Sequence, residues 1–336
     1  MTQPSDIVTH HAEATPLLAR AAPAWFKRGT GTLEFRMGLL AMLLAVVLSV
    51  LSPHFLTSAN LFNLLDQSVV VGIVAIGMTF VILTGGIDLS VGSVAGLSGI
   101  VLGLALRHFS IPVAIGFGVL AGAALGLVSG ILIGRFGLAA FVVTLGMMAI
   151  ARSLAYIFSG ATSITQLPEA LNNIVYSSFL GLPANVLALL VLYLLAWYYL
   201  TYTKGGRTIY AIGSNREAAR TAGLNVGFHS IVPYVVSGAL AAVAITFSSA
   251  QIMSIDPLAG TNLELDSIAA VVIGGASLFG GRGTLVGTLI GVFIMVMIRN
   301  GLNLLGVSPF WQGSAVGGVI IAAVLIERIL STRSRR

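Results

Sequence analysis

Two glycine-rich segments interrupt the apolar sequence and carry the polar groups best suited to line a path for a polar molecule. The first, 84–92, reads T-G-G-I-D-L-S-V-G, and the second, 274–283, reads G-G-A-S-L-F-G-G-R-G. Both contain G-G-x-x-L and a further glycine three residues on. Paired interruptions of this kind mark broken helices along a transport pathway, although a tight turn between two spans has the same composition. Both interpretations stay open, and Thr84, Asp88 and Ser90 are the candidate pathway residues.

Three further polar side chains lie inside apolar stretches, where a polar group is costly unless it has a partner. We expect Arg152 to face other helices, with an acid such as Asp88 or several backbone carbonyls as its partners. Asn300 and Asn303 are three residues apart and therefore share one helix face. They can hydrogen-bond a polyhydroxylated ligand in the pathway or tie neighbouring helices together, and the sequence does not separate these two roles.

The residues needed for most enzyme chemistry are missing. There is no cysteine, which excludes thiolate metal sites and cysteine nucleophiles. Neither of the two lysines, Lys27 and Lys204, precedes Ser or Thr, so the chain has no phosphate-binding P-loop. An intramembrane hydrolase built on Ser90 or Ser277 would need a nearby histidine base, and the five histidines are poorly placed for that role. We therefore expect no catalytic residue, no metal and no cofactor bound by this chain.

Composition places the chain in a membrane. Of its 336 residues 57% are hydrophobic and 8% are charged, against roughly 25% charged in an ordinary soluble domain. The mean hydropathy of +1.01 leaves too few polar side chains to cover a water-soluble globule. The net charge of +6 comes from Arg and Lys at the two ends and in one loop, which indicates orientation in a lipid bilayer and not nucleic-acid binding.

Apolar runs of roughly 17–25 residues predict an all-α, polytopic integral membrane protein with about ten transmembrane helices. The predicted spans are 37–52, 68–84, 90–106, 111–134, 139–158, 184–202, 229–250, 266–279, 284–304 and 309–326. An even number of spans puts both termini on one side, and the acids Glu169, Asp256 and Glu264 then fall in outer loops. With cytoplasmic termini, the positive-inside rule is satisfied by 14 of the 17 basic residues: Arg20, Lys27, Arg28, Arg36, Arg135, Lys204, Arg207, Arg216, Arg220, Arg282, Arg328, Arg333, Arg335 and Arg336.

The chain divides into three predicted parts. Residues 1–34 form a polar cytoplasmic tail, 35–328 a transmembrane domain, and 329–336 a basic cytoplasmic tail. Within the transmembrane domain, glycines recur every four residues over 118–134 and again over 283–291. Small residues at this spacing form a stripe on one helix face, which predicts close packing against another helix.

The most charged internal stretch, 204–228, is predicted to be a cytoplasmic loop. Asn215 is a suitable N-cap for a short helix, and Gly223 is a suitable C-cap. A short helix outside the membrane suits docking to a soluble partner, whereas a solvated loop that merely obeys the positive-inside rule is the alternative. The candidate docking residues are Gly213, Asn215, Arg216, Glu217, Ala218, Ala219, Arg220 and Gly223.

Several motifs resemble one transporter family. The sequence E-A-A at 217–219, followed by Gly223, resembles the E-A-A-x-x-x-G motif by which permease subunits of bacterial ABC importers dock on their ATPase, although the wider motif fits only in part. Residues 77–92, 210–226 and 264–306 are similar to segments of the monosaccharide permease family typified by the ribose and galactofuranose importers. The resemblance covers about residues 35–330 in the expected order.

This resemblance implies an assembly in the bacterial inner membrane. Two permease chains, identical or related, form the pathway, two ATPase subunits bind beneath and use ATP and Mg, and a periplasmic sugar-binding protein docks outside. Arg216, Glu217 and Arg220 would then contact the ATPase. The cargo would be a monosaccharide, or alternatively another polyol-like or signalling molecule. An ion-coupled transporter acting alone is a different class, and the scarcity of intramembrane acids weighs against it.

Overall fold

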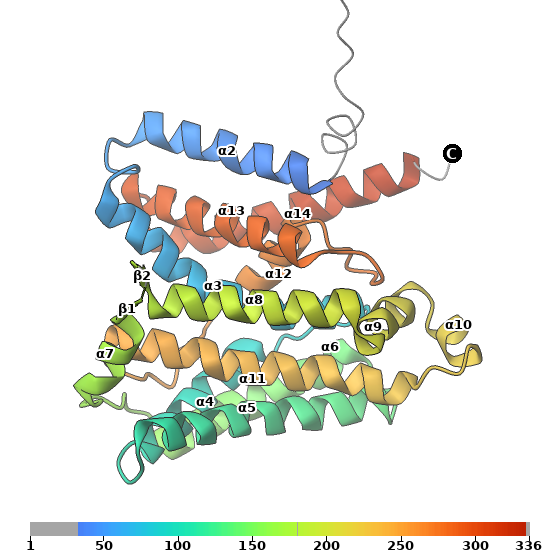
Figure 1. Cartoon of the computed structure of the whole chain (residues 1–336), viewed down its shortest axis with the longest axis horizontal. Helices are drawn as coiled ribbons and strands as arrows, with labels where there is room; N and C mark the ends of the chain where they lie inside the picture. Colours follow the sequence, from blue (N-terminus) through green and yellow to red (C-terminus); the bar gives the residue numbers. More distant parts are fainter. Residues whose placement is uncertain (1–32, 180, 334–336) are drawn as a thin grey trace, which may run out of the picture.

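The computed structural model of the chain describes residues 33–179 and 181–333, and their backbone is almost entirely helical (Figure 1). The long helices are α2 (Leu33–Leu51), α3 (Ser58–Leu83), α5 (Ile111–Gly134), α6 (Ala140–Ser159), α8 (Ala184–Tyr202), α11 (Val226–Ile252), α13 (Leu285–Leu304) and α14 (Pro309–Arg333). The shorter helices are α4 (Val91–Ala105), α7 (Glu169–Tyr176), α9 (Lys204–Ser214), α10 (Arg216–Thr221) and α12 (Leu263–Ile273). Strands β1 (Ser178–Phe179) and β2 (Leu182–Pro183) form a small antiparallel hairpin. The predicted all-α class is confirmed.

Seven of the described helices are long and apolar enough to cross a membrane, namely α2, α3, α5, α6, α8, α11 and α13. This confirms a polytopic membrane protein. Each of the ten predicted spans coincides with a helix, but α4 has only 15 residues and α12 only 11. At 1.5 Å per residue these two helices extend about 22 and 16 Å, less than the roughly 30 Å of a hydrocarbon core. The count of ten spans therefore stays a prediction.

Several of the predicted span boundaries are wrong, and two of them concern segments predicted to lie in outer loops. Helix α3 begins at Ser58, well before the predicted start at residue 68, because Thr57 caps it by accepting a hydrogen bond from the Asn60 amide. Helix α12 begins at Leu263, so Glu264 lies in its first turn and not in an outer loop. Both segments are therefore more helical than the sequence suggests.

The ends of the bundle agree with the predicted orientation. Figure 1 places the start of α2, the pair α9–α10 and the end of α14 at one end, with α7 and the hairpin at the other. The first of these is the end that the sequence assigns to the cytoplasm. Most of the predicted tail 1–34 and the last residues of the tail 329–336 lie outside the described residues.

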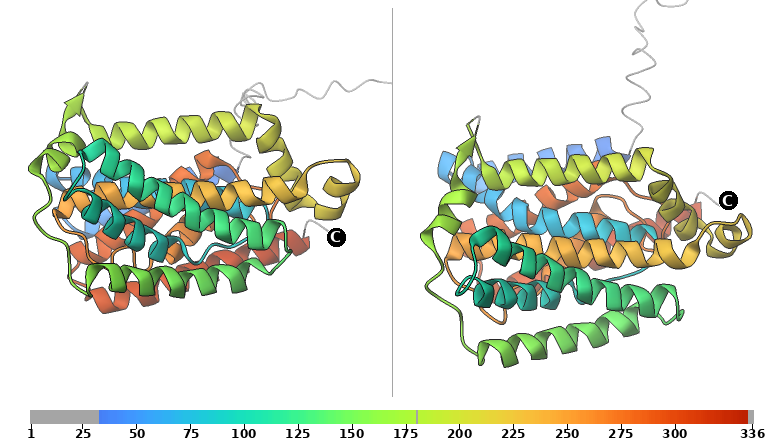
Figure 2. Two further views of the ribbon diagram at one scale, coloured as in Figure 1. Left: turned by 90° about the horizontal axis from the view of Figure 1, so that it is seen from below. Right: turned by 60° about the horizontal axis from the view of Figure 1, so that its bottom comes forward.

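Four of the five regular glycines of α5 pack against α11, and the two helices lie side by side in Figure 2. A Cβ atom on Gly122 would meet the carbonyl oxygen of Gly238, and one on Gly238 would meet that of Gly122. Gly126, Gly130 and Gly134 likewise face the α11 backbone without room for a side chain. The predicted close packing is confirmed, and it makes α5 and α11 one tightly fitted pair.

Helix α3 lies at the centre of the molecule. It is buried along most of the stretch from Ser68 to Leu83, and it contacts α8, α11, α12 and α13. By contrast, α2, α5, α6 and α8 carry many exposed Leu, Val and Phe side chains. Such an apolar exterior suits acyl chains or a second membrane subunit as its surroundings, and it leaves the polar groups of the spans to face inward.

Candidate coupling and translocation site

The stretch 204–228, predicted to be a loop, is instead helical, with α9 and α10 followed by the start of α11. The short helix within it was predicted correctly. The Asn215 side chain caps α10 by accepting a hydrogen bond from the Ala218 amide at 2.9 Å. At the other end the cap is Ala222, and Gly223 follows it with a φ of 78°. Gly223 is thus one residue beyond the predicted cap, in the left-handed conformation that commonly ends a helix.

Helix α10 stands clear of the rest of the molecule (Figure 1). Its side chains Arg216, Glu217, Ala218 and Arg220 are exposed, whereas Ala219 is buried against its neighbours. One face of the helix is therefore fixed to the protein and the other is free. The free face carries two guanidinium groups and one carboxylate, a surface suited to polar contacts with a soluble partner.

Gly213, at the end of α9, is the point where α9 packs against both glycine-rich segments. A Cβ atom there would meet the carbonyl oxygen of Leu83 and the amide of Gly281, which are hydrogen-bonded to each other at 2.9 Å. A Cβ atom on Gly280 would lie 2.8 Å from the Gly85 amide and 2.9 Å from Gly213. Three chain segments thus meet backbone to backbone, and only glycine allows this approach.

A tyrosine reinforces this junction from the side of α9. The Tyr210 hydroxyl donates a 2.8 Å hydrogen bond to the carbonyl oxygen of Gly283. Burial raises the pKa of Tyr210, so the hydroxyl keeps its proton and remains a donor. The end of α9 is therefore tied to the loop before α13 by a hydrogen bond as well as by packing.

Both glycine-rich segments are loops between helices. The first joins α3 to α4 and the second joins α12 to α13. Because α4 and α12 are shorter than a hydrocarbon core, the two predicted crossings to which they belong would need irregular backbone to complete them. Asp88 and Ser90 in the first loop are each only 3% exposed. Irregular backbone buried in protein in this way satisfies the condition for tolerance at membrane depth.

Asp88 ties the first loop to α11. Its Oδ1 accepts hydrogen bonds from the Ser90 amide at 3.0 Å and the Ser90 hydroxyl at 2.6 Å, and its Oδ2 accepts one from the Ser237 hydroxyl at 2.8 Å. Thr84 instead donates to the carbonyl oxygen of Val81 at the end of α3. Asp88 and Ser90 therefore lie together, with Asp88 as the acceptor that fixes the loop, and Thr84 takes no part in these hydrogen bonds.

The predicted pairing of Arg152 with Asp88 is wrong, and the alternative of backbone carbonyls is confirmed. Arg152 Nη1 donates to the carbonyl oxygens of Pro257 at 2.5 Å and Ala259 at 3.2 Å. Asp88 faces away, toward Ser237 of α11. Arg152 thus holds the loop that precedes α12 against the middle of α6.

Asn300 and Asn303 each bind another helix. Asn300 and Asn60 of α3 exchange two side-chain hydrogen bonds, at 2.7 and 3.0 Å, in a buried position. Asn303 accepts a hydrogen bond from Gln312 of α14 at 2.6 Å. In the described state, the helix-tying role left open by the sequence accounts for both residues. Sequence reasoning did not find the partner Asn60, which lies before the predicted span.

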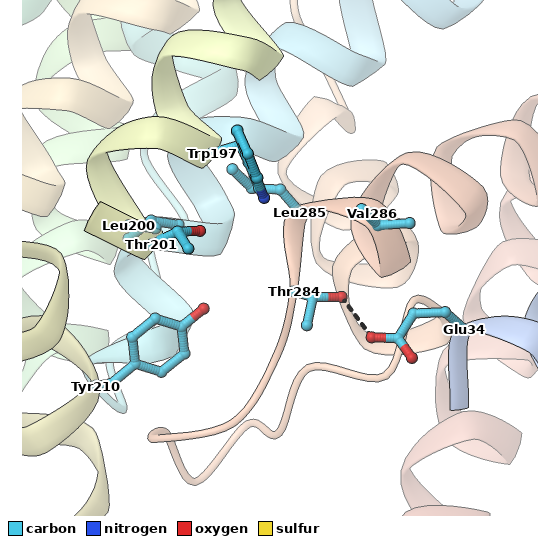
Figure 3. A pocket seen from close by; sticks show the side chains of 8 residues that line it. All are labelled: Glu34, Trp197, Leu200, Thr201, Tyr210, Thr284, Leu285 and Val286. Atoms are coloured by element: carbon cyan, nitrogen blue, oxygen red, sulfur yellow. Dashed lines mark hydrogen bonds between the residues drawn. The ribbon is translucent and has the colours of Figure 1, made fainter. Parts of the chain in front are cut away.

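A cavity of about 360 Å³ lies at the same end of the bundle as α9, between α2, α8, α9 and α13. Figure 3 shows Thr284 and Glu34 joined by a hydrogen bond on one side, with Trp197 and Tyr210 opposite. The hydroxyl of Thr284 donates to Glu34 Oε1 at 3.1 Å. Glu34 was predicted to belong to the polar tail, so its contact with the helix bundle had no signal in the sequence.

The comparison with protein families decides what kind of protein this is. The family described as "Branched-chain amino acid transport system / permease component" matches residues 60–325. The chain belongs to this permease family. It is accordingly a multi-pass membrane transport subunit and not itself an enzyme.

The permease also has similar curated relatives. The ribose import permease protein RbsC of Escherichia coli (strain K12) is 42% identical over 291 residues, covering 85% of this chain and 91% of the relative. RbsC of Bacillus subtilis (strain 168) is 42% identical over 289 residues, covering 85% and 90%. The D-allose transport system permease protein AlsC of Escherichia coli (strain K12) is 38% identical over 310 residues, covering 91% and 93%. No solved structure gave a significant match.

Proposed function

We propose that this permease carries a monosaccharide into the cytoplasm as the membrane subunit of an ATP-driven ABC importer. The observation that supports ATP-driven transport is the exposed helix α10, which is connected through α9 and its Gly213 to two buried glycine-rich loops. The similarity to a ribose and a D-allose permease along nearly their whole length supports the cargo class. The family description speaks of branched-chain amino acids, but these relatives are sugar permeases by name.

In this proposal the chain binds no cofactor, and a partner ATPase binds ATP and Mg. The ATPase holds α10 through Arg216, Glu217 and Arg220. When ATP closes the ATPase, α10 moves together with α9, and Gly213 presses on the loops 84–90 and 274–284. Asp88 and Ser90 belong to the inner gate, since they fix the first of these loops to α11. A rigid element with two arrangements is what such coupling requires.

Two further partners complete the proposed assembly. A second permease chain, identical or related, lies against this one in the inner membrane, covering part of the apolar exterior. A periplasmic sugar-binding protein docks at the end that carries α7 and the hairpin. It delivers the sugar and contributes most of the selectivity. Arg152 fixes the outer loop against α6, and Asn300 and Asn303 hold the helices around the pathway in register.

Reconstitution tests this proposal. Proteoliposomes containing the permease, its ATPase and its binding protein are supplied with D-ribose, D-allose or L-leucine, with and without internal ATP. We expect ATP-dependent accumulation of a sugar and none of leucine. Accumulation of leucine alone would move the cargo to the amino-acid class. Uptake by the permease alone would replace the ATP-driven mechanism with an ion-coupled one.

A further inference from the structure

A second cavity, of about 560 Å³, lies between α4, α6 and the start of α12. Its polar lining consists of Ser93, Arg152, Ser153, Tyr156, Thr261 and Glu264. None of these residues is among the pathway candidates predicted from the sequence. The size falls in the roughly 300–1,000 Å³ range of small-molecule sites, which combine an apolar wall with a few polar groups.

The cavity lies at membrane depth because the chain before α12 descends into the bundle. This segment starts at Ile255, which pairs with Ile164 through two backbone hydrogen bonds. Side chains of these two residues lie beside Gly103 near the end of α4, whereas Gly260 and Glu264 lie beside Gly92 in its first turn. The separation of 11 positions between the two glycines corresponds to about 16 Å of helix, roughly half of a hydrocarbon core.

Arg152 holds this descending segment and also faces the cavity. Both of its hydrogen bonds within the described residues leave from Nη1, so the N–H groups on Nη2 and Nε add no further tie to the segment. Glu264 contributes a carboxylate from the first turn of α12. An arginine and a carboxylate without a mutual ion pair in the described structure therefore line one cavity, together with three hydroxyl-bearing aliphatic side chains.

This lining matches the chemistry of a sugar. Each sugar hydroxyl both donates and accepts a hydrogen bond, and the wall offers donors from Arg152, acceptors from Glu264, and both from Ser and Thr hydroxyls. The C–H faces of a sugar ring need an apolar surface, which Tyr156, Met148 and Leu258 provide. A purely apolar cargo would leave these polar groups desolvated and unpaired, at a cost in affinity.

We propose that this cavity is a monosaccharide-binding station on the outer half of the translocation pathway. Glu264 accepts from sugar hydroxyls, Arg152 and Ser93 donate to them, and Tyr156 packs against the ring. The inference rests on the proposed sugar-import function. It adds that this permease holds the sugar itself, at named residues, after the binding protein releases it.

The absence of cysteine from the chain allows a direct test. Single cysteines replace Ser153 or Thr261 in the cavity, and Ala139, exposed at the start of α6 and away from the end where the binding protein docks, serves as the control. The assembled transporter, with its binding protein present in both arms, is treated with a thiol-specific methanethiosulfonate reagent. One arm also contains D-ribose, or the panel sugar that the wild-type complex accumulates.

Sugar should slow labelling of Ser153→Cys and Thr261→Cys by about tenfold at a concentration ten times its Kd, and leave labelling of Ala139→Cys unchanged. Unchanged labelling at both cavity positions overturns the proposal. Glu264→Gln, which keeps the side chain's size, should lower ATP-driven uptake by about tenfold or more with the ATPase still assembled. Wild-type uptake by this variant also counts against the site. If wild type accumulates no sugar, the proposed function itself fails; if it does and the cavity is not protected, only the station fails.

Discussion

Gly213 is the position where one added methyl group should interrupt coupling most sharply. In Gly213→Ala the new Cβ enters the space between the carbonyl oxygen of Leu83 and the amide of Gly281, closer to both than real Cβ atoms come to backbone. Neither atom belongs to a flexible side chain, so the backbone itself must move. The hydrogen bond that joins α3 to the loop before α13 lies at this point.

The expected loss of uptake follows from the free-energy cost of overpacking, which is about 1–3 kcal/mol for one carbon inserted into a packed site. If this strain falls on only one of the two transport states, it shifts the equilibrium between them by about 5–150-fold. ATP-driven sugar uptake per folded permease should therefore fall by about fivefold or more. The exposed face of α10 is untouched, so the ATPase should still co-purify.

The matched control is Gly116→Ala in α5, where an added Cβ has no heavy atom within 4 Å. That substitution should leave uptake unchanged. Uptake is measured in proteoliposomes and divided by the amount of monodisperse, folded permease. If Gly213→Ala transports as well as Gly116→Ala, the contact of α9 with the two glycine-rich loops does not couple the ATPase to transport. The mechanism proposed for α9 then fails.

Three other substitutions test separate parts of the account. Glu217→Ala on α10 should weaken co-purification of the ATPase and ATP-driven uptake without changing thermal stability; unaltered assembly and uptake would remove α10 as the docking element. Asp88→Asn keeps only one acceptor oxygen for the Ser90 and Ser237 hydroxyls, so uptake should fall severalfold with the complex still assembled, and wild-type uptake would exclude Asp88 from the gate. Asn300→Ala leaves buried Asn60 short of a partner and should cost about 1–3 kcal/mol in a thermal unfolding assay, whereas the exposed Asn303→Ala should cost little; equal effects would contradict the assigned roles.

The membrane class and the short docking-type helix were readable from the sequence because they depend on local signals. Apolar runs of span length predict helices directly, and Asn215 with Gly223 frames α10 by cap chemistry alone. The glycine stripe of α5 also predicted its close packing, since the absence of a side chain at every fourth residue permits only that.

The partners of the polar groups were not readable, because they depend on contacts between residues far apart in the chain. Arg152 binds carbonyls of 257–259, more than a hundred residues later, and Asn300 pairs with Asn60, 240 residues earlier. The cavity around Glu264 was missed for the same reason. In the sequence alone, the segment before α12 and the short helix α12 have the composition of an outer loop followed by a short span.

The most direct test of the account is ATP-driven sugar uptake by the reconstituted transporter, with each component omitted in turn. The account predicts that a monosaccharide accumulates only when permease, ATPase, binding protein and ATP are all present, and that Glu217→Ala abolishes most of this uptake. Accumulation by the permease alone, driven by an imposed proton or sodium gradient and indifferent to ATP, would contradict it.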